Sequence, residues 1–391
     1  MSMRRITGEY ATTRFGDEEV RAFVPYALPP TEPTLVFSSA LVARLQAAEQ
    51  ALRRLELAGE MVPSLDYFIY AFVRKEAVLS SQIEGTQATL VDLLEFESRG
   101  DDAPVPGADL EEICNYLDAL KFARAQLVDP KAPPLSMRLL GATHERLMQS
   151  VRGGDKFPGQ VRTTQNWIGG SRPGNAAYVP PPPSLLAELL SDFDKYIHAS
   201  DDTPMLVRAG MLHVQFETIH PYLDGNGRIG RLLVTLLLEH WGLLPRPLLY
   251  LSVFLKRHKS EYYRRLSAVR SEGAWEEWLD FFLDGVSTVA DESVASAKDL
   301  NRCVSEDHTR LLGLSDVSVG ALRLFYKLPE HPVVTIARAV QLCHLTKPTA
   351  ARAIGQLCDT GILHETTGRQ RDRMFAYTRY LDVLRVGTEL G

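Results

Sequence analysis

The sequence predicts a mainly α-helical protein of more than one domain, with one short β-hairpin and a C-terminal winged helix-turn-helix. Apolar residues recur with helical spacing along most of the 391 residues. A stretch rich in glycine and asparagine, 160–179, interrupts that spacing, and beyond residue 315 the helices become short. The length allows about two or three domains, and 45% hydrophobic residues are enough to form a buried core.

Composition and charge exclude several classes of protein. A net charge of −6 argues against a basic surface over the whole chain, although local basic patches remain open. The charged start is not followed by the apolar stretch of a secretory signal, and the apolar run 232–238 is far too short to span a membrane. We therefore expect a cytoplasmic protein with no membrane partner. The four cysteines form no C-x-x-C pair, so neither a zinc site nor a disulfide framework is indicated: Cys114, Cys303, Cys343 and Cys358.

The first 109 residues are expected to begin as an extended, proline-interrupted stretch and to continue as helices. A helix is predicted over 38–57, and Ser64 can cap a second helix that starts near residue 65 and ends before Gly85. The same apolar spacing predicts further helices over 110–127, 136–148, 184–198, 204–219, 228–241, 260–271 and 275–297.

The segment 160–179 differs from its surroundings and reads as a hairpin or flap. Glycines and asparagines alternate there with β-prone residues such as Trp167, Ile168 and Tyr178. Four consecutive prolines, 180–183, then form a stiff extended connector.

The C-terminal part changes character. Polar residues over 301–309 indicate a linker, and short helices are predicted over 319–328, 335–344 and 346–360. Two strands, 362–366 and 374–378, are predicted on either side of a basic turn. Three helices followed by a basic hairpin are typical of a winged helix-turn-helix. The turn carries three arginines that favour contact with phosphates but are equally ordinary as solvated side chains: Arg369, Arg371 and Arg373. Winged helices also serve in dimerisation or protein docking, so these roles stay open beside DNA binding.

The segment 220–231 contains the candidate catalytic and anion-binding residues. Its sequence is His-Pro-Tyr-Leu-Asp-Gly-Asn-Gly-Arg-Ile-Gly-Arg. Pro221 disfavours continuation of the preceding helix, and the glycines that flank Asn226 permit a tight loop. A new apolar helix starts directly after the loop. Because the first N–H groups of a helix have no partner inside it, such a loop is suited to binding an anion.

The side chains of this segment fit a phosphate site. Arg228 and Arg231 lie three residues apart and can donate to phosphates. Asp224 offers a hard oxygen ligand for Mg²⁺, and His220 has a pKa range suited to proton abstraction. Asp-Gly and Asn-Gly are also ordinary turn signals, so the spacing alone leaves a plain capping loop open. No Gly-Lys-Ser/Thr follows, which excludes a Walker loop.

This segment resembles the signature of the Fic (filamentation induced by cAMP) family, His-Pro-Phe-x-Asp/Glu-Gly-Asn-Gly-Arg-x-x-Arg, and departs from it only at Tyr222. The stretch 158–170 resembles the family's target-docking flap, and 35–94 resembles its N-terminal module. The resemblance implies a Fic-type helical bundle. The expected divisions are an N-terminal helical region over 1–109, a catalytic core over 110–300, a linker over 301–314 and a winged-helix-like domain over 315–391.

The resemblance implies a protein adenylyltransferase, which moves AMP from ATP to a Tyr, Thr or Ser hydroxyl of a target protein or of itself and releases pyrophosphate. His220 would deprotonate the hydroxyl, and Asp224 would hold Mg²⁺ against the phosphates. The flap would pair with the target through Asn166, Trp167, Ile168 and Gly169. The remaining ATP contacts would come from Gly225, Asn226, Gly227, Arg228 and Arg231, with Tyr262 near the adenine.

A second segment, Ser80-Ser81-Gln82-Ile83-Glu84-Gly85, resembles the inhibitory signature of the family, Ser/Thr-x-x-x-Glu-Gly/Asn. Ser80 and Glu84 are four residues apart and share a helix face. The resemblance implies that Glu84 pairs with Arg231 where the γ-phosphate should lie. We therefore expect the protein to inhibit itself through an N-terminal helix that ends at Gly85.

Other functions compete with this reading. The first is a DNA-binding transcriptional regulator that works through the winged helix, with DNA as its partner. The second is a Fic enzyme that uses another nucleotide or removes AMP. A homodimer is compatible with each of them.

Overall fold

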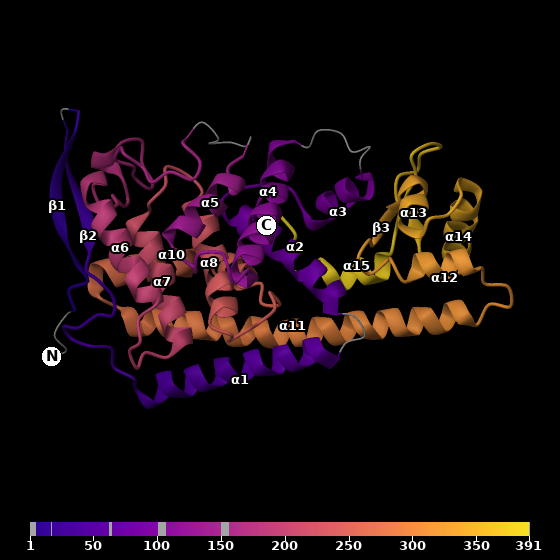
Figure 1. Ribbon diagram of the computed structural model, residues 1–391, viewed down its shortest axis with the longest axis horizontal. Helices are drawn as coiled ribbons and strands as arrows, with labels where there is room; N and C mark the ends of the chain where they lie inside the picture. The colour runs from indigo at the N-terminus through magenta and orange to yellow at the C-terminus, as the bar shows by residue number, and fades with distance from the viewer. Residues whose placement is uncertain (1–4, 17, 62–64, 101–106, 150–155, 391) are drawn as a thin grey trace.

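The computed structural model describes residues 5–16, 18–61, 65–100, 107–149 and 156–390. It confirms the predicted mainly α-helical class, and its shape is elongated because the long helix α11 (Trp275–Leu312) runs along most of its length (Figure 1). In the part of the chain described, no helix combines the length and the apolar character needed to cross a membrane.

The helices before α11 build the bundle that carries the predicted site. Helix α1 packs along α11, and α7 and α8 pack against each other beside α4 and α5 (Figure 1). Their bounds are α1 (Ser39–Met61), α2 (Leu65–Ile83), α3 (Leu90–Ser98), α4 (Ala108–Val128), α5 (Met137–Leu147), α6 (Leu186–Ile197), α7 (Met205–Ile219), α8 (Asn226–His240), α9 (Ser252–Arg257) and α10 (Lys259–Glu272). Helices α3 and α9 were not predicted, although the Thr89–Asp92 capping box at the start of α3 is a signal in the sequence.

The N-terminal stretch forms an antiparallel hairpin where only an extended chain was expected. Strand β1 (Gly8–Phe15) pairs with β2 (Glu18–Pro25), in a register that joins Gly8 to Pro25 and Phe15 to Glu18. Predicting the extended conformation was right, but the pairing was missed. Pro25, which has no N–H to donate, stands at the last position of the ladder.

The segment 160–179 forms a short flap that is closed by one antiparallel bridge. In the described chain it contains only an isolated bridge between Ile168 and Tyr178 and a short 3₁₀ turn, Pro173–Asn175. Gly169 and Gly170 both have positive φ, at 69° and 74°, which turns the chain away before a ladder can extend. The prediction of a short hairpin or flap agrees with this conformation, in which one antiparallel bridge closes an otherwise irregular segment.

The expected linker over 301–314 is another difference, because α11 continues to Leu312. Leu300, Cys303 and Leu311 are buried on one face of this helix at helical spacing, which keeps the polar stretch packed against the core. The sequence interpretation gave too much weight to the polar residues of the opposite face.

The chain beyond α11 contains short helices and a small sheet, in the order β3–β5–β4. Three helices precede the basic turn, as predicted, and an unpredicted strand, β3, pairs with β5. Assignment to the winged-helix class stays a prediction. The elements are α12 (Val319–Phe325), β3 (Val333–Thr335), α13 (Ile336–Cys343), α14 (Lys347–Asp359), β4 (His364–Glu365), β5 (Met374–Ala376) and α15 (Thr378–Leu384).

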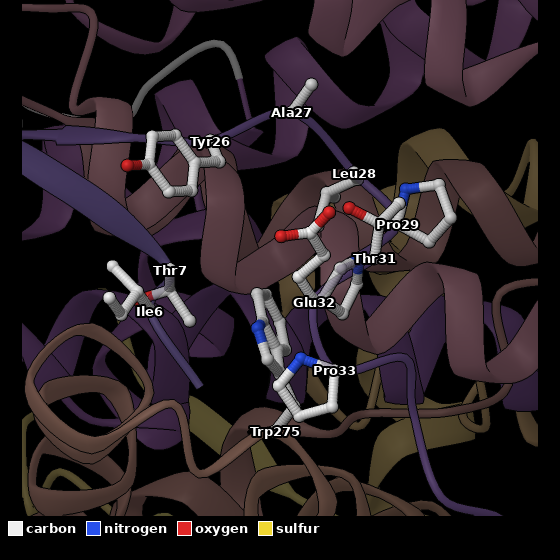
Figure 2. A pocket seen from close by; sticks show the side chains of 11 residues that line it. Ile6, Thr7, Tyr26, Ala27, Leu28, Pro29, Thr31, Glu32, Pro33 and Trp275 are labelled. Carbon is white, nitrogen blue, oxygen red and sulfur yellow. The ribbon is translucent and has the colours of Figure 1, made fainter. Parts of the chain in front are cut away.

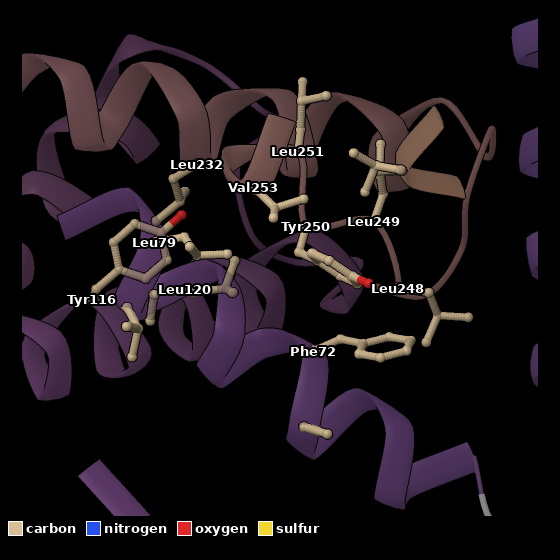
Figure 3. Close-up of a cluster of buried hydrophobic side chains, with 14 of the residues drawn as sticks. Phe72, Leu79, Tyr116, Leu120, Leu232, Leu248, Leu249, Tyr250, Leu251 and Val253 are labelled. Atoms are coloured by element: carbon tan, nitrogen blue, oxygen red, sulfur yellow. The ribbon is translucent and has the colours of Figure 1, made fainter. Parts of the chain in front are cut away.

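Helix α2 lies inside the core. Figure 3 shows Phe72 and Leu79 of α2 against Tyr116 of α4, Leu232 of α8 and Tyr250 before α9. Each of these side chains is at most 2% exposed. Burial of one such side chain contributes about 1.5–3 kcal/mol, so the packing holds α2 firmly beside the loop that follows α7.

A cavity of about 930 Å³ opens at the base of the hairpin, between residues 26–33 and the start of α11. Figure 2 shows Trp275 and Pro33 along its wall, with the Glu32 carboxylate nearby. None of its lining residues belongs to the predicted site.

Candidate active site

The loop between α7 and α8 is built around a sharp reversal at His220. This residue has the left-handed conformation, with φ 50° and ψ 61°, and its N–H still donates to the Phe216 carbonyl. The buried Arg162 stabilises this turn. Its Nε donates to the His220 carbonyl at 2.9 Å, and its backbone N–H donates to the Pro221 carbonyl. His220 therefore leaves the helix at a defined angle.

Asn226 closes the loop. Its Oδ1 accepts the Tyr222 N–H at 2.9 Å and its Nδ2 donates to the Tyr222 carbonyl at 2.8 Å, so both functional groups of the side chain are used within the loop. Gly225 has φ 75°, and a Cβ there would lie 2.8 Å from Met148 Sδ. Asn226 and Gly227 begin α8, and their backbone N–H groups belong to its first turn.

Ser80, Glu84 and Arg231 meet at the start of α8. Arg231 donates from Nη2 to Glu84 Oε1 at 2.6 Å and from Nε to Ser80 Oγ at 2.9 Å. The Glu84 carboxylate also covers Gly227, where a Cβ would lie only 2.2 Å from Oε1. Burial raises the pKa of Glu84, but the Arg231 guanidinium outweighs it and holds that pKa below its usual value. An anionic group therefore occupies the end of the helix that attracts anions.

Arg228 forms its ion pair with a different carboxylate, that of Glu112. Its Nη1 lies 2.9 Å from Oε1 of Glu112 on α4, and its Nη2 lies 3.8 Å from Asp224 Oδ1. Nothing in the sequence indicated Glu112, which is distant along the chain.

Asp224 is the carboxylate of the loop. Lys156 Nζ contacts its Oδ2 at 2.9 Å, and the Gly225 N–H donates to its Oδ1 at 2.7 Å. Burial raises the pKa of Asp224, whereas the Lys156 and Gly225 contacts bring it below the usual value, so the group is ionised at neutral pH. The described residues contain no cluster of three or more His, Cys, Asp or Glu that could hold a metal by itself. One carboxylate beside a phosphate site is the arrangement in which Mg²⁺ is bound together with its substrate.

The His220 imidazole is placed to accept a proton. Its Nδ1 lies 3.4 Å from the Glu217 carbonyl, a contact that favours the tautomer with the ring proton on Nδ1, in which Nε2 is the acceptor. Burial lowers the pKa of His220 to about 4, so the ring is neutral at pH 7.

The flap residues are anchored to this loop. Asn166 donates from Nδ2 to the Tyr222 carbonyl at 3.0 Å, and Trp167 packs edge-on against Phe15 of the N-terminal hairpin. Both backbone groups of Ile168 bond Tyr178, so they are already used inside the chain. Gly169 follows at the turn. Of the four predicted flap residues, Asn166 is the one whose hydrogen bond to the loop the structure shows.

Tyr262 lies deeper than the sequence suggested. It is 1% exposed, and its hydroxyl bonds Nε2 of the buried His213 at 2.8 Å. His213 in turn bonds the Gly230 carbonyl at 2.9 Å. The neighbouring Tyr263 is 42% exposed and is the more accessible ring of the pair.

His144 of α5 is a residue that sequence reasoning missed. Its Nδ1 accepts the Gly159 N–H at 2.8 Å, so its Nε2 donates to the Asp224 carbonyl at 3.0 Å. The ring also stacks on Tyr222 at 3.9 Å. One buried imidazole thus joins the start of the flap to the loop. The partners are 15 and 80 residues away, so no local signal reveals them.

His144→Leu is expected to lower stability by about 1–3 kcal/mol, because the Gly159 N–H and the Asp224 carbonyl lose their partner. The measurement is urea unfolding of the variant and the parent. His198→Leu serves as a control, because it removes a histidine–carbonyl bond to Leu135 that lies outside the loop. An unchanged midpoint for His144→Leu would contradict the role given to this residue.

Comparisons with known proteins find relatives over the part of the chain that carries this loop. Residues 42–125 match the model of the Fic/DOC family N-terminal region, and residues 134–238 match the Fic/DOC family model. The chain is 30% identical over 195 residues to the protein adenylyltransferase Fic of Culex quinquefasciatus and 28% identical over 225 residues to that of Drosophila grimshawi. These matches cover 49% and 56% of this chain, but only 36% and 42% of the relatives.

Solved structures share the fold. A Fic family protein from Desulfovibrio desulfuricans G20 has a TM-score of 0.55 and 20% identity, over 88% of this chain and 97% of that one. Fic-1 (aa134–508) from C. elegans has a TM-score of 0.50 and 19% identity, over 66% and 73%. The fold and the loop define a Fic-type protein. The chain carries a Fic/DOC family N-terminal region over residues 42–125 and a Fic/DOC family region over residues 134–238.

Proposed function

We propose that this protein is an autoinhibited protein adenylyltransferase. The observation that carries the proposal is the Glu84 carboxylate, which lies 2.6 Å from Arg231 and directly over Gly227. A carboxylate held by a guanidinium at the start of a helix stands where a phosphate of ATP would bind. Relatives named protein adenylyltransferase support the choice of ATP and of a protein substrate.

In the proposed reaction, the oxygen of a target hydroxyl attacks the α-phosphorus of ATP. The bond from that phosphorus to the bridging oxygen of the β-phosphate breaks, and pyrophosphate leaves. His220 Nε2 takes the hydroxyl proton. The N–H groups at the start of α8 stabilise the charge on the phosphate oxygens, and Arg231 binds the γ-phosphate once Glu84 has moved away.

Asp224 would hold Mg²⁺, which neutralises phosphate charge when it is bound. Lys156 forms an ion pair with the same carboxylate in this structure and would have to move away for Mg²⁺ to bind. The flap would position the target segment as an added strand. Because the Ile168 N–H already bonds Tyr178, neighbouring backbone groups would have to make these contacts.

The direct test is incubation of the protein and its Glu84→Gly variant with a cell lysate and labelled ATP, GTP, CTP or UTP. Labelled protein is expected with ATP, including the enzyme itself. Labelling with another nucleotide alone, or loss of pre-attached AMP, would favour the alternative Fic activities.

Asp224→Asn in the Glu84→Gly background is expected to abolish Mg²⁺-dependent transfer, because the described residues offer no metal cluster that could replace it. The measurement is AMP incorporation against Mg²⁺ concentration. The control is Asp194→Asn, which changes a carboxylate that bonds the Met137 N–H outside the loop. A variant that keeps the parent's Mg²⁺ response would contradict this role.

A second candidate function is DNA binding by the C-terminal elements. Lys347 and Arg352 of α14 are exposed, as are the three arginines between β4 and β5, which supports contact with phosphates. The test is binding of duplex DNA at several salt concentrations by the parent and by a variant with Arg369, Arg371 and Arg373 changed to Ala. If binding does not weaken with salt, or if the arginine variant binds DNA as tightly as the parent, this function is ruled out. A homodimer and a cytoplasmic location stay predictions.

A further inference from the structure

The chain after α15 returns to helix α2. Residues 387–389, here called the tail segment, lie beside the last turn of α2, near the end marked C in Figure 1. Gln82, two residues before Glu84, donates from Nε2 to the Thr388 carbonyl at 3.1 Å and to the Ala88 carbonyl at 3.0 Å. Gln82 and Thr388 are both buried. The tail segment therefore contacts the turn of the chain that places Glu84.

Two lysines, one on α9 and one on α10, add to this contact. Lys256 Nζ donates to Gln82 Oε1 at 2.7 Å and to the Glu389 carbonyl at 2.5 Å, so one ammonium group joins α9, α2 and the tail segment. Lys259 Nζ donates to the Ile83 carbonyl at 2.6 Å, at the end of α2. A helix end whose last carbonyls have partners is less prone to fray.

The other C-terminal elements also hold α2. The Tyr67 hydroxyl donates to the Tyr326 carbonyl at 2.9 Å, and the Tyr70 ring lies 5.9 Å from the ring of His331. The C-terminal elements are themselves fixed to α11, where the Tyr377 hydroxyl donates to Asp307 at 2.8 Å. Helix α2 is thus held between the catalytic bundle and the C-terminal elements at its beginning and at its end.

We propose that the tail segment is a latch that sets the position of the inhibitory carboxylate. By bonding Gln82, it holds the last turn of α2 so that Glu84 stays on Arg231. Movement of the C-terminal elements would then loosen that turn and free the phosphate site. Gln82 is a positioning residue in this account, since it acts through Glu84, and the inference rests on the proposed function.

Gly387→Val is the test variant, because it disturbs the tail segment without changing α2. Gly387 has φ 83°, which a β-branched residue disfavours, and a Cβ would lie 3.0 Å from Val253 Cγ2. Gly368→Val is the matched control. Gly368 lies between β4 and β5 with φ 61°, so the substitution imposes similar strain, but no atom lies within 4 Å of its Cβ position. Gln82→Leu removes the contact from the other side.

Gly387→Val and Gln82→Leu are each expected to raise AMP incorporation about 5-fold or more. Gln82→Leu removes the three hydrogen bonds of this side chain, and Gly387→Val displaces the tail carbonyls that accept from Gln82 and Lys256. Gly368→Val should match the parent. In a Glu84→Gly background neither variant should add to the rate, since the carboxylate that the latch positions is gone. A rise for Glu84→Gly but not for the two latch variants would overturn the proposal.

Amide hydrogen exchange over residues 82–86 gives a readout that does not depend on activity. Gly387→Val should speed exchange in this turn relative to Gly368→Val. If no variant, including Glu84→Gly, incorporates AMP, the proposed function fails, yet exchange still decides whether the tail segment holds α2. Equal exchange in the two glycine variants would overturn the latch.

Discussion

His220→Ala, made in the Glu84→Gly background, is expected to lower AMP transfer roughly 10²–10⁴-fold while ATP binding is retained. The substitution removes the proton acceptor, and loss of general-base catalysis has about this effect. The proposed phosphate contacts belong to α8 and would be untouched, because His220 lies outside the first turn of that helix. The measurements are labelled AMP incorporation and equilibrium binding of ATP.

The pH dependence gives a second check on the same residue. Burial lowers the pKa of His220 to about 4, so the base is neutral and competent from about pH 6 to about pH 8. Transfer by the Glu84→Gly variant should therefore change little over that range and fall as the pH approaches the pKa. His198→Gln is the control and should leave this profile unchanged, since His198 bonds the Leu135 carbonyl outside the loop. A rate for His220→Ala equal to that of its background would remove His220 from the mechanism.

Glu84→Gly is expected to raise AMP incorporation, including self-modification, roughly a hundredfold. Arg231 is buried and bonds the Glu84 carboxylate at 2.6 Å, so it cannot also hold the γ-phosphate in that position. ATP bound beside the carboxylate would be displaced, and a misplacement of about 1 Å can cost about a hundredfold in rate. Glu84 lies beyond the last residue of α2, so glycine there leaves the helix intact.

Two controls define this effect. Glu97→Gln removes a carboxylate of α3 that pairs with Arg74 of α2 at 2.8 Å, away from the loop, and should leave the rate unchanged. Adding Arg231→Ala to Glu84→Gly should abolish the gain. If Glu84→Gly is no faster than the parent, or if the double variant keeps the gain, inhibition through this pair is wrong.

The local geometry of the loop could be predicted because its residues are contiguous. His220, Asp224 and Arg231 lie within twelve residues, and Pro221 and Gly225 mark the break and the turn in the chain. The pairing of Glu84 with Arg231 spans 147 residues, and only the resemblance to a family indicated it. Once α2 packs beside α8, that pairing follows from the fold.

The parts that could not be predicted depend on distant contacts. Glu112, His144 and Lys156 reach the loop from other segments, and their own neighbours in the sequence give no sign of it. The length of α11 depends on burial of a few apolar side chains within a polar stretch. The tail segment meets Gln82 across 306 residues, which no sequence spacing could reveal.

The central claim is that the site transfers AMP and not phosphate, and the position of the label in ATP tests it most directly. The Glu84→Gly variant is incubated with Mg²⁺ and a protein target, or alone, using ATP labelled at either the α- or the γ-phosphorus. The account predicts protein labelled from the α-position and label from the γ-position released as pyrophosphate. Protein labelled from the γ-position, or from neither, would contradict it.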